Sequence, residues 1–377
     1  MANVLSTELR LRVLAALVDG NSVRATERMT DVNFRTILRF GVLLGEGAQR
    51  LHDRMMRDLQ CSSIQVDEIW SYVKKKQARV DPEKDGPDVG EAYTFVALDA
   101  SSRMVLSFYV GKRDQASTDV FMADVRSRLV VMPAMTSDGF APYISAIGAN
   151  FGKSIDYAQT VKNYRSGGRR EDYRYEPPRD PFITKKAIYG TPDLDRASTA
   201  YVERNNGTMR HVNGRIRRLC YAFSKKLENH KAAVALAYVH YNFCHVVKTL
   251  RVTPAMAAGV TDHVWGLEEF MEAVLLAAPV EKPVAQPLAH RTPAGPARAL
   301  PNGRGFLRVV GGTSSPVAPP PGPVPPPAAP ALAREHVTVP VSSGPAGQMD
   351  LLSWRAPAPK PARRVQLDLF GIEMDPE

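Results

Sequence analysis

Three acidic residues stand where they could hold divalent metal ions. Asp67 lies inside the apolar run 64–70, Asp138 ends a short apolar segment at 136–139, and Glu203 falls in a segment with helical spacing. A carboxylate inside an apolar strand is costly when it is buried without a partner, so Asp67 indicates a site. An Asp-Asp-Glu set of oxygen ligands suits two magnesium or manganese ions. Such a pair activates an attacking oxygen and stabilises a leaving 3′-oxygen at a scissile phosphate.

Each of these residues also has an ordinary structural explanation. Asp138 could be a turn residue, and Glu203 could form an ion pair on a helix face with Arg204 or Arg210. Glu68 follows Asp67 in a strand, so we expect it on the opposite face and solvated. The rival ligands, all explained by turns or helix starts, are Asp99, Asp114 and Asp119.

A basic strip follows Glu203. Between Arg204 and Lys231 the chain has eight Lys or Arg residues against one acid, Glu228. A solvated helix face usually mixes its charges, whereas a one-sign strip beside a metal site would hold phosphates. The predicted DNA contacts here are Arg204, Arg210, Arg215, Arg217, Arg218, Lys225 and Lys226.

Helical spacing predicts the N-terminal elements. Residues 6–20 and 22–29 form two short helices, and a third begins after Asn33 with an apolar stripe that includes Phe34 and Ile37. Two helices joined by a short turn, with exposed arginines on the second, outline a helix-turn-helix. Asn33, Arg35, Thr36 and Arg39 would then lie at the DNA groove. The alternative is a small helical bundle used only for packing.

From Ser63 the apolar period changes to two. It predicts an antiparallel meander of strands near 64–73, 93–98 and 104–110, followed by a helix at 115–130. A short strand that ends at Asp138, another helix and a helical segment from Thr199 to about His245 complete the order. That order predicts a ribonuclease-H-like α/β fold with a mixed sheet and flanking helices, in which the three carboxylates converge.

Composition divides the chain. Of its 30 prolines, 21 lie between Pro279 and Pro376. We therefore expect a disordered Pro-rich tail at 279–377, of which 279–345 is a tether. The folded part would comprise an all-α helix-turn-helix domain at 1–60 and a catalytic domain at 61–278.

The remaining composition narrows the class. The formal net charge of +10 favours an anionic polymer as partner. The three cysteines, Cys61, Cys220 and Cys244, are widely spaced and indicate neither a disulfide framework nor a zinc site. Without a signal peptide or an apolar span, the sequence predicts a soluble protein of the bacterial cytoplasm, associated with the nucleoid.

Several motifs resemble the transposases of the insertion-sequence-one family of bacterial elements. They lie at 64–77, 98–100, 110–114, 136–139, 201–206, 222–230 and 240–244, and the likeness runs from about residue 6 to 272. Membership implies a DDE transposase with a ribonuclease-H-like core. Glu203 follows Asp138 at a longer distance in sequence than in many DDE transposases, so the resemblance implies an insertion at about 150–198 in the catalytic domain. The resemblance carries the catalytic and metal-binding triad onto Asp67, Asp138 and Glu203, with DNA ends as substrate and a dimer or higher oligomer on paired ends.

Two alternatives to a transposase stay open. One is a non-catalytic DNA-binding regulator with a helix-turn-helix on a decayed transposase body. The other is a ribonuclease-H-like nuclease, which would not require the N-terminal helices.

The tail carries a second kind of motif. Gln366, Leu367, Asp368, Leu369 and Phe370 resemble the short peptide by which bacterial polymerases and repair proteins bind the replicative sliding clamp, and 348–352 looks like a weaker copy. In such peptides the apolar residues fill a pocket. The sequence predicts a clamp contact, with a fortuitous apolar end as the alternative.

Overall fold

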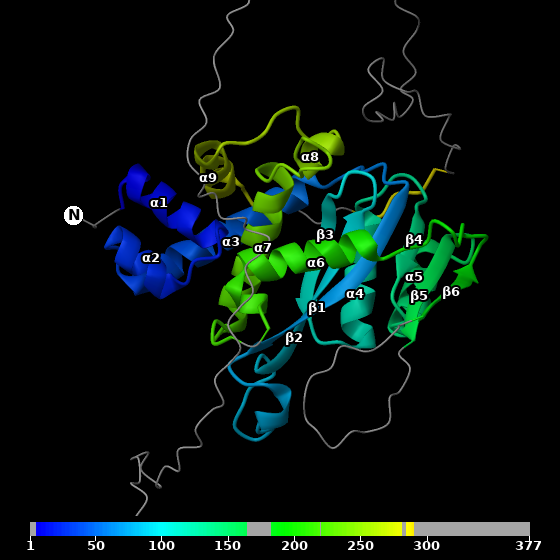
Figure 1. Ribbon diagram of the computed structural model, residues 1–377, viewed down its shortest axis with the longest axis horizontal. Helices are drawn as coiled ribbons and strands as arrows, with labels where there is room; N and C mark the ends of the chain where they lie inside the picture. Colours follow the sequence, from blue (N-terminus) through cyan, green and yellow to red (C-terminus); the bar gives the residue numbers. More distant parts are fainter. Residues whose placement is uncertain (1–4, 164–181, 219, 281–283, 290–377) are drawn as a thin grey trace, which may run out of the picture. The chain divides into compact units, whose positions relative to one another are not determined.

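The computed structural model describes residues 5–163, 182–218, 220–280 and 284–289. The helices are α1 (Thr7–Val18), α2 (Val23–Thr30), α3 (Phe34–Met55), α4 (Gln115–Ser127), α5 (Pro142–Phe151), α6 (Ala200–Val212), α7 (Leu227–Phe243), α8 (Pro254–Ala257) and α9 (Leu267–Leu276) (Figure 1). The strands are β1 (Ser63–Val73), β2 (Gly90–Asp99), β3 (Val105–Gly111), β4 (Ala134–Ser137), β5 (Asp156–Asn163) and β6 (Phe182–Tyr189). Short 3₁₀ turns lie at Gln77–Arg79 and Gly214–Ile216.

The strands form a mixed sheet of six in the order β3-β2-β1-β4-β5-β6, within the described part of the chain. β2 pairs antiparallel with β1 on one side and with β3 on the other, which confirms the meander predicted from the sequence. β4 pairs parallel to β1, and β5 pairs parallel to β4. β6 closes the described sheet antiparallel to β5. This mixed sheet with flanking helices is compatible with a ribonuclease-H-like fold.

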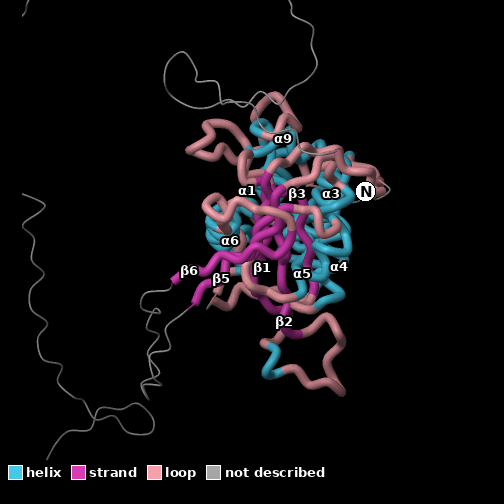
Figure 2. The backbone as a smooth tube through the Cα atoms, turned by 90° about the vertical axis from the view of Figure 1, so that its right-hand side faces the viewer, coloured by secondary structure: helices cyan, strands magenta, loops and turns pink. Residues whose placement is uncertain are grey.

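Helices cover both faces of the sheet. Figure 2 shows α6 on one side of it and α4 and α5 on the other. Ile64, Gln65 and Val66 are consecutive residues of β1 and are all buried, as expected for a central strand that is covered on both faces. Phe95 of β2 packs against Phe121 of α4, with ring centroids 5.5 Å apart.

Two segments differ from their sequence-based expectation. The stretch 150–198, interpreted as an insertion, contributes β5 and β6 to the sheet. The helical stretch from Thr199 to about His245 is divided into α6 and α7, because α6 ends at Asn213 and a 3₁₀ turn follows. The Asn213 side chain accepts from the backbone N–H of Arg215 at 3.1 Å and so starts that turn instead of extending the helix.

The three N-terminal helices form where the sequence predicts them. Ser6, Ser22 and Asn33 occupy the N-cap positions, and each side chain accepts a backbone N–H of the first turn. Glu27 of α2 accepts the backbone N–H of Phe34 at 2.9 Å, which fixes the turn between α2 and α3. The helix-turn-helix role of these elements stays a proposal.

α3 is longer than a recognition helix requires, and its C-terminal half packs on the body of the protein. A Cβ on Gly45 would lie 2.3 Å from the carbonyl oxygen of Ala232 in α7. A Cβ on Gly47 would lie 2.2 Å from that of Val274 in α9. Glycine is therefore required at both positions for α3 to approach α7 and α9 closely.

The described residues end at Ala289, inside the Pro-rich segment. Residues 284–289 were expected to lie within the tether. They contact the body instead, through a parallel β-bridge between Ala289 and Val131. The rest of the tail, including the clamp-like residues 348–352 and 366–370, lies outside the described residues. No helix in the described part of the chain is long and apolar enough to cross a membrane.

Candidate active site

Sheet pairing brings Asp67 and Asp138 together. In the parallel register of β1 and β4, Val66 pairs with Ser137. Asp67 and Asp138 are the next residues on each strand, so both leave the same edge of the paired region. The backbone N–H of Phe140 donates to Asp138 Oδ1 at 3.0 Å, which holds Asp138 in a turn at the end of β4.

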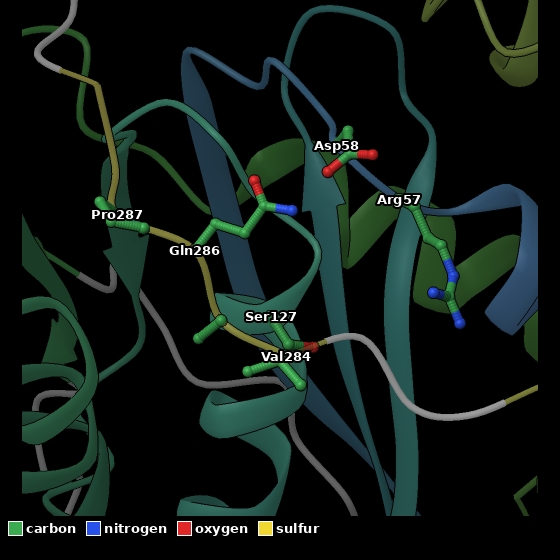
Figure 3. A pocket seen from close by; sticks show the side chains of 7 residues that line it. Arg57, Asp58, Ser127, Val284, Gln286 and Pro287 are labelled. Atoms are coloured by element: carbon green, nitrogen blue, oxygen red, sulfur yellow. The ribbon is translucent and has the colours of Figure 1, made fainter.

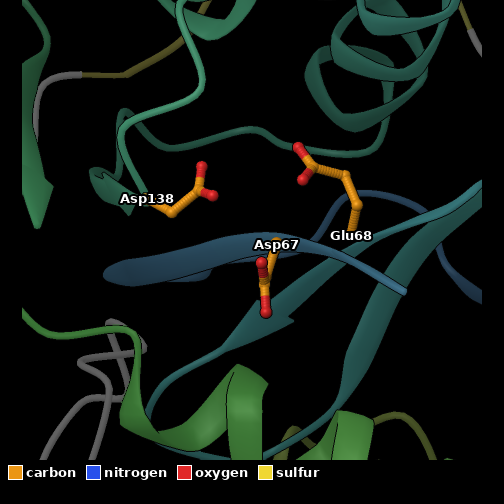
Figure 4. A group of neighbouring side chains, drawn as sticks. All are labelled: Asp67, Glu68 and Asp138. Carbon is orange, nitrogen blue, oxygen red and sulfur yellow. The ribbon is translucent and has the colours of Figure 1, made fainter. Parts of the chain in front are cut away.

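A third carboxylate completes this group, and it is not the predicted one. Oxygen atoms of Asp67, Glu68 and Asp138 all lie within 4.8 Å of one another. Figure 4 shows the three side chains around the β1 ribbon, with Glu68 and Asp138 on one side of it. The structure thus joins two predicted ligands to a neighbour that was not predicted.

The expectation of a solvated Glu68 is wrong. Its side chain is only 3% exposed, because α5 covers the face of β1 that the sequence left open. The buried Tyr143 of α5 lies beside it. Burial and then the Glu68 carboxylate raise the pKa of the Tyr143 phenol well above its usual value.

The three carboxylates repel one another, and they differ in exposure. The Glu68 side chain is 3% exposed, Asp67 is half-buried and the Asp138 side chain is 37% exposed. Burial, then the charge of Asp138, raise the pKa of Asp67 to about 6. The same two causes raise the pKa of Glu68 to about 7. Carboxylates that are buried together lack compensating positive charge, and a divalent cation with oxygen ligands would supply it. The donor set therefore fits magnesium or manganese.

α6 orients Asp67. The Gln65 side-chain oxygen accepts the backbone N–H groups of Tyr201 and Val202 at 2.9 and 3.0 Å. This contact fixes the first turn of α6 on β1, since these N–H groups have no acceptor within the helix. One turn later, Asn206 Nδ2 donates to Asp67 Oδ2 at 2.8 Å.

Glu203, the predicted third ligand, lies near this group but is bound elsewhere. Its carboxylate accepts from Lys162 Nζ of β5 at 2.6 Å and from Thr199 Oγ1 at 2.5 Å. Its charge contributes to the raised pKa of Asp67, after burial and Asp138. It is not among the three carboxylates that come within 4.8 Å of one another.

Arg113, in the turn between β3 and α4, is a cation that reaches this group. Its Nε lies 3.4 Å from Glu68 Oε2, and its Nη2 lies 3.9 Å from Asp138 Oδ2. The guanidinium lies over the Phe140 ring, 3.9 Å from the centroid. Both ion pairs are long, so Arg113 neutralises the carboxylates only in part.

The rival acids have local roles, as their sequence contexts indicated. Asp99 Oδ2 accepts from Ser102 N and Ser102 Oγ at 2.8 and 2.7 Å in the β2–β3 turn. Asp114 is the N-cap of α4 and accepts from Ser117 N at 2.8 Å. Asp119 pairs with Gln115 on the same helix.

The predicted DNA contacts divide into exposed and inward-facing groups. Arg210 is half-buried, and Arg215 donates to Ser224 Oγ at 3.0 Å. The exposed ones are Arg35, Thr36, Arg39, Arg204, Arg217, Arg218, Lys225 and Lys226, together with Asn33, whose side chain caps α3.

A pocket lies apart from these residues. It is lined by Arg57, Asp58, Ser127 and 284–287 (Figure 3). None of the three clustered carboxylates lines it.

Comparisons with known proteins do not assign the chain to a family. No family model matches the sequence, and no curated protein matches it. Among solved structures, the chain is similar to a piggyBac transposase in a cryo-EM synaptic complex with hairpin DNA, with 8% identity and a TM-score of 0.36. The match covers 72% of this chain and 69% of that one. At this level of similarity, function has to be inferred from the residues of the chain itself.

Proposed function

We propose that the protein is a DDE transposase of the insertion-sequence-one type, which binds the ends of its element and cleaves and joins DNA strands. The observation that carries this proposal is the pair Asp67 and Asp138. Asp67 lies on β1 and Asp138 directly follows the parallel strand β4, and burial and the charge of Asp138 raise the pKa of the half-buried Asp67. The sequence motifs around both residues resemble that family, and exposed basic residues follow on α6 and in the α6–α7 segment.

Asp67 and Asp138 would hold magnesium or manganese, two ions per site, with Glu203 as the third ligand of the family's triad. When bound, the ions supply electrophilic stabilisation of the phosphate and of the two oxygens exchanged at phosphorus. Asn206 keeps Asp67 oriented through its 2.8 Å hydrogen bond. Glu203 would have to exchange its contact with Lys162 for this role.

The reaction is an in-line displacement at a DNA phosphodiester. The bond from phosphorus to the attacking oxygen of water or a DNA 3′-hydroxyl forms as the bond to the leaving 3′-oxygen breaks. The nucleophile's proton passes to solvent, and no covalent enzyme intermediate is required. Arg204, Arg217 and Arg218 are exposed and would bind DNA phosphates without reading sequence.

The terminal repeats flanking the gene define the substrate for the test. The full-length protein is incubated with a duplex that carries one repeat and with Mg²⁺, and strand cleavage and transfer are measured. Asp67→Asn, Asp138→Asn and Glu203→Gln should each lower the cleavage rate at least about a hundredfold, with binding of the repeat preserved. Asp119→Asn, an exposed acid on α4, is the matched control and should cleave normally.

The same assay separates the two alternatives. A decayed regulator would bind the repeat without cutting it in any metal. A ribonuclease-H-like nuclease would cleave without preferring the repeat and would not join strands. Either result contradicts a transposase. Paired ends also predict a dimer or higher oligomer, which light scattering on the repeat complex would measure.

A further inference from the structure

Glu68 and Tyr143 form a buried polar pair that the triad of the proposed reaction does not use. The Glu68 side chain is 3% exposed, and Tyr143 is fully buried. Neither Glu68 Oε1 nor the Tyr143 hydroxyl makes a hydrogen bond of ordinary geometry with any described residue. An unpartnered carboxylate oxygen in such a place is expensive, so its presence requires a compensating interaction.

Arg113 does not provide that compensation by itself. It approaches only Glu68 Oε2, at 3.4 Å, and its side chain is 39% exposed. One partly hydrated guanidinium also faces Asp138, at 3.9 Å. Arg113 therefore compensates the charges of Glu68 and Asp138 only in part.

The three carboxylates are close enough to converge on one small divalent ion. With Mg–O bonds of about 2.1 Å, neighbouring oxygens of an octahedral magnesium ion are about 3 Å apart and opposite ones about 4.2 Å. The oxygens of Asp67, Glu68 and Asp138 lie within 4.8 Å of one another, so the side chains would have to close onto the ion. Glu203 would first have to leave Lys162 and Thr199.

We propose that Glu68 is a metal ligand, and that Asp67, Glu68 and Asp138 together bind the first divalent cation, with Glu203 dispensable for that step. Tyr143 is a positioning residue, whose hydroxyl supports the Glu68 carboxylate when the ion draws it inward. This inference rests on the proposed function for its role in catalysis, but the binding of the ion does not depend on DNA.

The test measures Mn²⁺ binding to the full-length protein without DNA. Electron paramagnetic resonance reports the free Mn²⁺, and calorimetry gives the affinity. Glu68→Gln should weaken the tighter Mn²⁺ site at least about tenfold, as Asp67→Asn should. Asp119→Asn, an exposed acid on α4, is the matched control and should leave it unchanged. Glu203→Gln tests whether Glu203 is dispensable for this ion and should change the affinity by less than about threefold. Unchanged Mn²⁺ affinity in Glu68→Gln, or a loss confined to Glu203→Gln, overturns the proposal.

A second measurement separates a metal ligand from a structural partner of Arg113. Without metal, Glu68→Gln removes a buried charge that Arg113 compensates only loosely and should raise the urea midpoint of unfolding. Added Mn²⁺ should then stabilise the wild type but stabilise the variant much less. A lower midpoint without metal, with the Mn²⁺ effect intact, would make Glu68 a structural residue. Failure of the transposase proposal looks different: Mn²⁺ binding would depend on Glu68, but no repeat DNA would be cleaved.

Discussion

Asp67 depends on a residue of another element for its orientation. Asn206 Nδ2 holds Asp67 Oδ2 at 2.8 Å, and Asn206 is itself buried in α6. Partners that orient a metal ligand commonly contribute ten- to a hundredfold to metal affinity or activity. The amide can therefore matter for catalysis without touching DNA.

Asn206→Ala should lower the single-turnover cleavage rate about ten- to a hundredfold and leave affinity for the terminal repeat unchanged. Gel-shift and quenched-flow measurements on the same preparation check both parts. Thr208→Ala is the control on the same helix, because the Thr208 hydroxyl bonds only back to Arg204 O. A cleavage rate equal to wild type would show that Asp67 needs no support from α6.

The site residues differ in how far the sequence predicts them. Asp67 and Asp138 follow from a carboxylate in an apolar strand and one at a strand end. Glu68 was missed because strict alternation puts it on the other face of β1, and the sequence does not show that α5 buries that face. The contact between Glu203 and Lys162 joins residues of α6 and β5, a pairing that no local pattern encodes.

At the scale of elements, α7 is joined to β1 through a buried histidine. His230 Nε2 lies 3.1 Å from Ser71 Oγ, and His230 Nδ1 lies 3.1 Å from Ser224 Oγ. Burial, with a smaller contribution from the nearby Arg215, lowers the pKa of His230 to about 4. The folded protein therefore keeps His230 neutral at pH values where an unfolded chain protonates it.

The free energy of unfolding should decrease as the pH falls from 7.5 to 5. As the pH falls, the histidine of the unfolded chain, with a pKa of about 6.5, binds a proton before His230 of the folded protein does. His230 therefore lowers the free energy of unfolding by about 2 kcal/mol between pH 7.5 and pH 5. His230→Gln should remove that part of the pH dependence, which urea unfolding at both pH values measures. The buried His52 and His240, whose pKa values burial also lowers, leave a residual slope. Parallel curves for variant and wild type would refute the assignment.

The N-terminal helices offer a second test at this scale. Arg35, Thr36 and Arg39 are exposed on the first turns of α3. The rest of α3 packs against α7 and α9 through Gly45 and Gly47, so an excised fragment 6–58 would lose that packing. Tests of DNA recognition therefore belong on the full chain.

If Arg35 reads a base, Arg35→Ala should weaken binding to the terminal repeat by about 1–3 kcal/mol more than binding to random DNA. Fluorescence anisotropy on both duplexes at one salt concentration measures the difference. Arg12→Ala is the control, since Arg12 is an exposed arginine of α1 paired with Glu8. Equal losses on both duplexes would make Arg35 a phosphate contact, and no loss on either would favour the packing-only bundle.

Element order was predictable where strands are long and apolar. The meander and the α4–β4–α5 order follow from periodicity, and the structure confirms them. β5 and β6 were not predicted, because stretches such as Asp156–Asn163 mix polar and apolar residues and β6 is largely exposed at the described edge of the sheet. β5 pairs with β4, and β6 pairs with β5, contacts between segments that no local pattern encodes.

At the scale of the whole molecule, the C-terminal segment is rich in proline. The chain carries 21 of its 30 prolines from Pro279 onward, which predicts a tether. Residues 284–289 still contact the body, through the Ala289 bridge to Val131. A tether would therefore begin after Ala289, and the motifs at 348–352 and 366–370 lie in that part of the sequence.

A tethered Gln-Leu-Asp-Leu-Phe segment is expected to bind the replicative sliding clamp, because its leucine and phenylalanine side chains suit an apolar pocket and its glutamine a polar contact. A peptide of residues 361–377 should bind the host clamp with roughly micromolar affinity by calorimetry, and replacing Leu369 and Phe370 by Ala should abolish binding. In cells the same double change should reduce transposition, while cleavage by the purified protein stays normal.

Replacing Leu351 and Leu352 in the weaker copy should have a smaller effect, since that copy would act only by raising the local concentration of the tail at a ring with several pockets. If the peptide shows no clamp binding at high micromolar concentration, or if the double change leaves transposition unaffected, the apolar end of the tail is fortuitous.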